Sequence, residues 1–275
     1  MSAELQEIKW IHRFPVRTPT LPPATHTNVY VIGEGDLAVI DPASPWPEER
    51  AALDRFLDDL GTRGGRVVEI LLTHHHVDHV SGAVWLAERL SVPIAAHAVT
   101  AELLAPRIPI ARTLSDGDVL SYGPATLDVL HTPGHAPGHL VFVERSSRAV
   151  IAGDMVASVG TIVIDPPEGD MRLYLASLER LRGLDARLLL PAHGPPAHDP
   201  ERLLSYYIAH RLEREARVVA ALALGAASLE KLVPRAYPDV PAAIHPLAAR
   251  SLLAHLQKLR DEGRACENEG VWSSD

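Results

Sequence analysis

Five side chains of the types that bind metal ions, four histidines and an aspartate, fall within six positions, and this segment constrains the fold more than any other. The motif is His74-x-His76-x-Asp78-His79. It follows the apolar run Val67–Leu72, which predicts a buried strand, and it precedes an apolar pattern around Leu86 that predicts a helix. An irregular loop between a strand and a helix can turn several side chains toward one point. The sequence therefore predicts a metal site on a strand-to-helix loop.

Three later segments each carry a ligand-type residue next to a predicted strand. His139 closes the segment Thr132-Pro133-Gly134-His135-Ala136-Pro137-Gly138-His139, Asp154 follows Gly153, and His193 follows Pro191-Ala192. Loops at one edge of a layered fold gather functional residues from distant parts of the chain. We therefore expect these side chains to meet the histidine-rich loop.

Strand and helix patterns alternate from the N-terminus to about residue 198, which predicts layered sheets covered by helices. The predicted helices are Pro47–Leu60 and Met171–Arg182. The predicted strands are Asn28–Gly33, Leu37–Asp41, Val67–Leu72, Pro93–His97, Thr126–Leu130, Leu140–Glu144, Ala149–Ala152, Thr161–Ile164 and Leu188–Leu190. The first two strands are expected to form a hairpin through Gly33-Glu34-Gly35-Asp36.

The amino-acid composition changes after Asp199-Pro200, where the segments become rich in Leu, Ala and Arg. They predict three helices, Glu201–Leu224, Ser228–Ala236 with Ser228 as N-cap, and His245–Glu262, and then a hairpin within Arg264–Trp272. We expect a catalytic domain over residues 1–198 and a small, mainly helical, winged-helix-like subdomain over 199–275.

These motifs closely resemble the metallo-β-lactamase superfamily over residues of about 28 to 198, and the end of the chain resembles the β-lactamase-like protein 2 family. The resemblance implies an α+β fold, a four-layer αβ/βα sandwich. It implies that one metal ion is held by His74, His76 and His139, and a second by Asp78, His79 and His193. Asp154 is then the bridge between the ions, and Asp41 and His135 are expected to support the ligands.

The chemistry of that ligand set predicts a metal-dependent hydrolase. Imidazole and carboxylate suit Zn²⁺, so we expect two Zn²⁺ per chain, with iron or manganese as alternatives. Two such ions can lower the pKa of a shared water toward about 7, and the resulting metal-bridging hydroxide attacks the substrate. Asp78 is also expected to accept or return a proton. The predicted substrate is a thioester, an ester or a phosphodiester.

Composition and charge favour some classes of substrate and partner over others. The net charge of −9 and the tail's balance of acidic and basic residues favour a small-molecule or acyl-thioester substrate over nucleic acid. The sequence has no apolar run long enough for a membrane span, and Met1–Trp10 has no secretory pattern, so a cytoplasmic location is expected. Homodimer formation is left open.

Three alternatives stay open at this point. One is a mononuclear-iron oxygenase of the persulfide dioxygenase kind, which uses only part of the ligand set. Another is a single-strand-specific ribonuclease, an activity described in the β-lactamase-like protein 2 family. The third is a non-catalytic protein whose winged helix carries the function.

Overall fold

The computed structural model describes residues 8–275, which form two compact units. The first comprises the chain up to Thr132 together with Gly138–Thr161 and Asp185–Pro200. The second comprises Pro133–Pro137, Ile162–Leu184 and Glu201–Asp275. The predicted absence of a leader concerns residues 1–10, of which 1–7 lie outside the described residues. The domain boundary after residue 198 stays a prediction.

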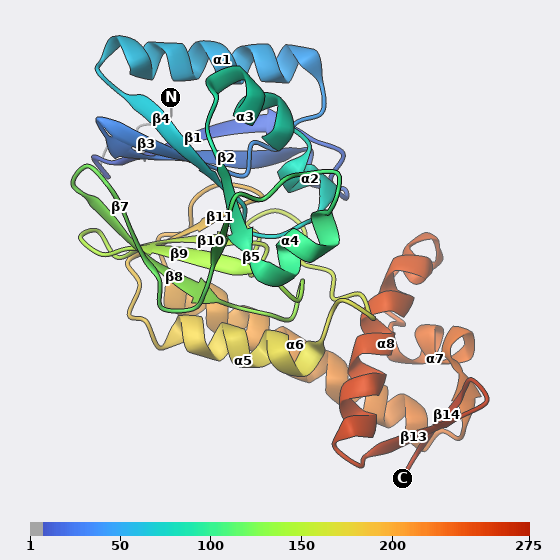
Figure 1. Ribbon diagram of the computed structural model, residues 1–275. Helices are drawn as coiled ribbons and strands as arrows, with labels where there is room; N and C mark the ends of the chain where they lie inside the picture. The colour runs from blue at the N-terminus through green and yellow to red at the C-terminus, as the bar shows by residue number, and fades with distance from the viewer. Residues whose placement is uncertain (1–7) are drawn as a thin grey trace. The chain divides into compact units, whose positions relative to one another are not determined.

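A six-stranded sheet forms one layer of the first unit (Figure 1). Its strands follow in chain order: β1 (Ile11–Arg17), β2 (His26–Glu34), β3 (Asp36–Ile40), β4 (Arg66–Leu71), β5 (Ile94–His97) and β6 (Arg112–Leu114). The pairs from β1 to β3 are antiparallel, and those from β3 to β6 are parallel. The predicted hairpin between β2 and β3 is confirmed.

A five-stranded sheet forms the second layer, in the order β11-β10-β9-β8-β7. Its strands are β7 (Val119–Tyr122), β8 (Ala125–His131), β9 (Leu140–Glu144), β10 (Ala149–Gly153) and β11 (Leu188–Pro191). Buried side chains of both sheets, such as Tyr30, Ile40, Phe142 and Leu190, form one apolar cluster. The two sheets therefore pack face to face.

Helices cover the other face of the first sheet. They are α1 (Pro47–Thr62), α2 (Val77–Val80), α3 (Ala83–Leu90) and α4 (Ala98–Leu104). Leu57 of α1 and Leu86 of α3 belong to one buried cluster with Val39 and Ile70 of the sheet. Strands buried on both faces read as almost continuous apolar runs, which is why β3 and β4 stand out in the sequence.

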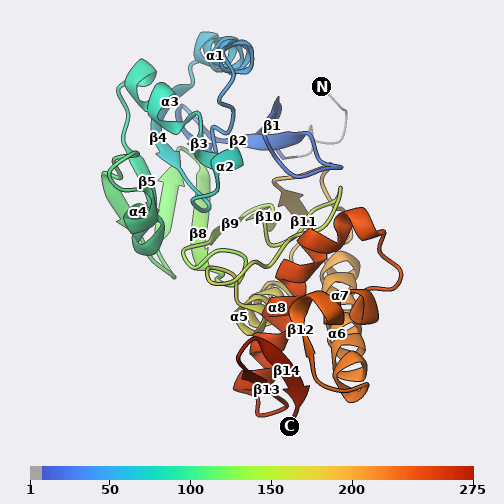
Figure 2. The ribbon, with the colours of Figure 1, turned by 90° about the vertical axis from the view of Figure 1, so that its right-hand side faces the viewer.

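The second unit is mainly helical, and Figure 2 shows its C-terminal helices beside a small ribbon. Its elements are α5 (Met171–Arg182), α6 (Pro200–Ala223), β12 (Ala227–Ser228), α7 (Leu229–Ala236), a 3₁₀ turn (Ala242–Ile244), α8 (His245–Asp261), β13 (Ala265–Asn268) and β14 (Val271–Ser274). Leu232, Leu252, Leu256 and Trp272 form its core. Three helices with a three-stranded ribbon match the predicted winged-helix pattern. Ser228 is the N-cap residue of α7, although its side chain makes no capping hydrogen bond.

One predicted strand is wrong, and several elements were not predicted. Residues 161–164 form no strand, although Ile162 and Ile164 are buried. The run is apolar because it is buried in a loop, and Pro166 and Pro167 follow at once and lack the N–H that a ladder needs. The unpredicted β1 contains Pro15, which an edge strand tolerates. Among the helices of residues 8–275, none has the length and apolar character of a membrane span.

Candidate metal centre

The histidine-rich loop connects β4 to the single-turn helix α2. His76 is the N-cap residue of α2 in an extended conformation, and Asp78 and His79 lie in the helical turn. The change from extended to helical backbone turns side chains of neighbouring residues to the same side. His74 and His79 are fully buried, so the loop carries its imidazoles inward.

The second of the two predicted ligand groups consists of Asp78, His79 and His193. Each offers an atom that lies within 4.8 Å of the others. Nε2 of His193, which follows β11, is 3.5 Å from Oδ2 of Asp78. The structure thus joins the helical turn of the histidine-rich loop to a residue more than a hundred positions later in the chain.

The first predicted group is represented by His74 and His76, whose ligand atoms lie within 4.8 Å of one another and of an Asp154 carboxylate oxygen. Nε2 of His74 is 3.0 Å from Nδ1 of His76. His139 lies beside this group, with its ring centroid 5.1 Å from that of His74. Its Nε2 accepts the backbone N–H of Asp154 at 3.0 Å, so this nitrogen already has a backbone donor.

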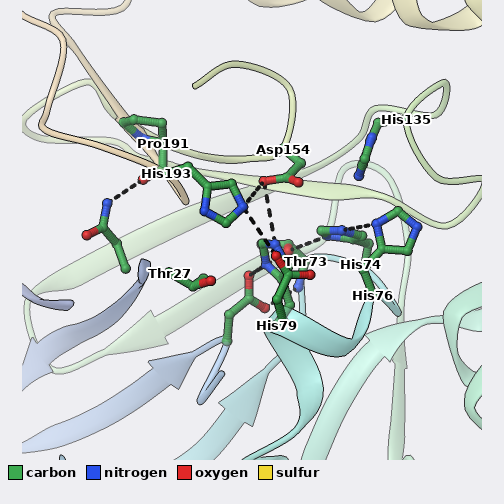
Figure 3. Close-up of polar contacts among 12 residues, drawn as sticks. Thr27, Thr73, His74, His76, His79, His135, Asp154, Pro191 and His193 are labelled. Atoms are coloured by element: carbon green, nitrogen blue, oxygen red, sulfur yellow. Dashed lines mark hydrogen bonds and ion pairs between the residues drawn. The ribbon is translucent and has the colours of Figure 1, made fainter. Parts of the chain in front are cut away.

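Asp154 contacts the group of Asp78, His79 and His193 (Figure 3), and its carboxylate also lies within 4.8 Å of the ligand atoms of His74 and His76. Its Oδ1 is 3.3 Å from Nε2 of His193 and 3.5 Å from Nε2 of His79. Burial by itself raises the pKa of this carboxyl, but His193 and His79 hold the pKa well below its usual range. The carboxylate is therefore charged where the two groups meet.

Hydrogen bonds from outside the two groups fix the imidazole orientations. Oδ2 of Asp41 is 2.8 Å from Nδ1 of His79, and the backbone oxygen of His26 is 3.0 Å from Nδ1 of His193. Each bond holds the proton on Nδ1 and leaves Nε2 of the same ring as an acceptor. Asp41 does this from a left-handed conformation, φ 51°, directly after β3.

Hydroxyl groups make the corresponding contacts to the other two buried histidines. Oγ1 of Thr73 is 3.0 Å from Nδ1 of His74, and Oγ1 of Thr132 is 2.9 Å from Nδ1 of His139. Sequence reasoning missed both threonines. Their only signal was position, since Thr73 directly precedes the histidine motif and Thr132 opens the segment that ends at His139.

The start of β2 holds the loop that carries His193. The side-chain amide of Asn28 donates to the carbonyls of Pro191 at 2.9 Å and Gly194 at 2.8 Å, and its backbone N–H donates to Ala192 at 2.8 Å. The hydroxyl of Tyr30 donates to Pro191 at 2.8 Å. Asn28 was not predicted as a site residue, because nothing local to the strand announces a partner so far along the chain.

Donor chemistry and burial test whether the residues fit metal ions. Burial lowers the pKa of His79, but the carboxylates of Asp154, Asp78 and Asp41 raise it well above its usual value, which shows how strongly this point favours positive charge. Nε2 of His79 is buried and has no hydrogen-bond partner among the described residues. Imidazole nitrogen and carboxylate oxygen are zinc donors, so the residues fit such an ion.

His135 belongs to the second unit, where its Nδ1 is 2.9 Å from the carbonyl oxygen of Val163. Its side chain is buried. Its predicted role in supporting the ligands stays a prediction.

Comparisons with known proteins identify the family of both parts of the chain. The sequence model of the metallo-beta-lactamase superfamily matches residues 22–193. That of the beta-lactamase associated winged helix domain matches residues 228–272. The first match covers more than half of the chain and contains every candidate ligand named above.

Two relatives and one solved structure are similar to this chain. Thioesterase pkgB of Emericella nidulans is 31% identical over 204 residues, which cover 74% of this chain but only 56% of that protein. The beta-lactamase-like protein 2 homolog of Drosophila melanogaster is 29% identical over 253 residues, 86% of this chain and 83% of that protein. A metallo-beta-lactamase family protein from Thermus thermophilus has a TM-score of 0.79 at 26% identity, with 98% of this chain and 100% of that chain covered. The chain therefore belongs to the metallo-beta-lactamase superfamily of metal-dependent hydrolases.

Proposed function

We propose that this protein is a dinuclear zinc hydrolase that cleaves an acyl thioester. His74, His76 and His139 would hold one ion and Asp78, His79 and His193 the other, with Asp154 available to both. An ion at Nε2 of His139 would replace the contact of this nitrogen with the backbone N–H of Asp154. The observation that carries the proposal is the place of the Asp154 carboxylate, which contacts His79 and His193 and lies within 4.8 Å of the ligand atoms of His74 and His76. A single-metal enzyme has no need for the complete second group.

The bound ions supply an activated water and a Lewis acid for the carbonyl oxygen of the thioester. The chain's own residues set the geometry. Asp41 and the backbone of His26 direct Nε2 of His79 and His193 inward. Asp78, whose Oδ2 faces His193, accepts the proton that leaves the attacking water. Cleavage then breaks the bond between the carbonyl carbon and sulfur, Asp78 returns its proton to the leaving sulfur, and the products are a carboxylic acid and a thiol.

The second unit supports a small acyl substrate over nucleic acid. In a helix-turn-helix module the second helix reads the DNA groove, and here that helix is α8. Ala254 and His255 of α8 are buried, α8 packs against α5, and Lys258 pairs with Glu215 of α6 at 2.7 Å. The exposed arginines of α8 are paired as well, Arg250 with Asp165 at 3.0 Å and Arg260 with Asp261 at 3.1 Å, so this helix offers little free positive charge to a phosphate backbone.

The β-ribbon of the second unit also argues against nucleic-acid binding. The tip between β13 and β14 exposes Glu267 and Glu269. Carboxylates at this point repel phosphate, so the ribbon does not supply the nucleic-acid contact that α8 lacks. The thioesterase name of the Emericella nidulans relative is consistent with the substrate class that remains. A cytoplasmic location and homodimer formation stay predictions.

The test is turnover of acyl thioesters of graded chain length, followed as thiol release, beside single-stranded RNA, an oxygen ester and a phosphodiester. We expect thiol release that a chelator abolishes and Zn²⁺ restores, and two zinc ions per chain by elemental analysis. One iron per chain with sulfur-dependent oxygen uptake would instead establish the persulfide dioxygenase alternative. Cleavage of RNA without thiol release would overturn the substrate class.

A further inference from the structure

We propose that Thr73 is a positioning residue whose single hydroxyl couples the two metal positions. The inference rests on the proposed two-metal site and adds to it a residue that contacts no metal. Thr73 is fully buried between β4 and the histidine motif. Its hydroxyl reaches His74 of one ligand group and Asp41, the carboxylate that supports His79 of the other (Figure 3).

The hydroxyl of Thr73 has one donor and one acceptor contact. Oγ1 is 2.6 Å from Oδ2 of Asp41 and 3.0 Å from Nδ1 of His74. A charged carboxylate only accepts hydrogen bonds, so the hydroxyl donates to Asp41. Its lone pair then accepts from Nδ1–H of His74, which leaves Nε2 of His74 as the nitrogen for a metal.

Asp41 extends this chain to the second ligand group. The same Oδ2 accepts from Nδ1 of His79 at 2.8 Å, while Oδ1 accepts the backbone N–H of Thr73 at 2.8 Å. The hydrogen bonds therefore run from His74 through Thr73 and Asp41 to His79. His74 belongs to the first group and His79 to the second, so loss of the hydroxyl disturbs both.

Thr132 provides the matched comparison. It is also fully buried, and its hydroxyl contacts Nδ1 of His139 at 2.9 Å. Among the hydrogen bonds described for this hydroxyl, both go to His139, a residue of the first group only. Removal of this hydroxyl should therefore weaken one position and spare the other.

The experiment compares Thr73→Val, Thr132→Val and Thr73→Ser in the full chain. Valine replaces the hydroxyl with a methyl group of similar size, and serine retains the hydroxyl. Zinc affinities come from stepwise competition with a chromogenic chelator, and the two positions are resolved by cadmium-113 NMR. Loss of an outer partner costs about 10- to 100-fold in metal affinity.

We expect Thr73→Val to weaken both binding steps by about 10- to 100-fold and to shift both cadmium resonances. We expect Thr132→Val to affect one step and one resonance, and Thr73→Ser to resemble the wild type. If Thr73→Val changes one position only, the coupling is wrong while the two-metal function stands. A wild-type chain that binds a single ion overturns both.

A measurement on the wild type keeps the inference testable if the valine variant does not fold. Nitrogen-15 NMR of labelled histidine distinguishes the two imidazole tautomers. The hydrogen-bond chain requires His74 and His79 both to carry their proton on Nδ1. A proton on Nε2 of His74 would contradict it.

Discussion

Asp154 is the residue on which both ligand groups depend. Its carboxylate contacts His79 and His193 and belongs to the cluster with His74 and His76. Asp154→Asn retains the shape but removes the charge that draws cations to this point. We expect the variant to bind fewer than two zinc ions per chain and to lose activity by more than the roughly 10- to 100-fold typical of an outer partner.

Elemental analysis after dialysis measures this loss, with Asp128→Asn as the control. Asp128 is a surface carboxylate of the same unit that pairs with Arg145 at 2.6 Å. Exposed pairs contribute little, so the control should retain both ions and its activity. Two tightly bound zinc ions in Asp154→Asn would show that Asp154 is not the bridge.

At the scale of single residues, the sequence predicts the metal ligands better than it predicts the residues that hold those ligands by hydrogen bonds. The spacing of His74, His76, Asp78 and His79 carries chemical meaning by itself, because four donors so close together have few other uses. Thr73 and Asn28 carry no such meaning, since a threonine or an asparagine is common in any loop or strand. Their roles come from hydrogen bonds to residues that are adjacent only after folding.

Among the elements, β2 has a function beyond its place in the sheet. Asn28 donates to the carbonyls on both sides of Ala192 and His193, and His26 accepts from His193. Asn28→Leu leaves two carbonyls without this donor, which costs about 1 to 3 kcal/mol of unfolding free energy. It also frees the loop, so we expect zinc binding to fall by about 10- to 100-fold.

Urea denaturation and zinc competition together test this prediction, with Thr27→Val as the matched control. Thr27 is a buried neighbour on β2 whose hydroxyl bonds to Thr18, 2.8 Å away, and not to the loop. The control should lose stability but retain zinc affinity. Equal zinc affinities in the two variants would show that Asn28 does not support the metal centre.

A local apolar pattern predicts an element correctly only where the rest of the chain also supplies the partners that the element needs. β9 and α5 were predicted at their observed bounds, because β9 is a short apolar run rich in β-branched and aromatic residues and α5 repeats its apolar residues at helical spacing. The segment 161–164 is a similar short run, with three β-branched apolar residues of which Ile162 and Ile164 are buried, yet it belongs to no sheet. Pairing depends on what the rest of the chain brings alongside, and a local pattern does not contain that information.

For the whole molecule, the predicted α+β class and the winged helix are confirmed by the two family matches. Both units combine apolar clusters with buried carboxylates, among them Glu69 in the first unit and Glu215 in the second. The first unit relies on two apolar clusters, one on each face of its six-stranded sheet. The second adds to its apolar core a buried carboxylate, Glu215 of α6, that pairs with Lys258 at 2.7 Å and Arg264 at 2.9 Å.

This carboxylate predicts how the second unit responds to acid. Burial by itself raises the pKa of Glu215, but His255, Lys258 and Arg264 together lower it to about 2. A folded pKa below the unfolded value stabilises the fold at neutral pH, by at most roughly 3 kcal/mol for this difference. That contribution is complete above about pH 4.5 and is lost as the pH falls toward 2.

Hydrogen exchange of α8 peptides, measured between pH 7 and pH 3 and corrected for the intrinsic rate, follows this loss. We expect wild-type protection to fall with the pH, whereas Glu215→Gln should start with lower protection and change less, because its amide does not titrate. Glu213→Gln is the control, since Glu213 forms an exposed pair with Arg217. The prediction is wrong if α8 in Glu215→Gln is protected as well as in the wild type at pH 7. The attraction in the buried ion pairs would then only offset the cost of removing the charges from water, and the stability of the second unit would come from its apolar core alone.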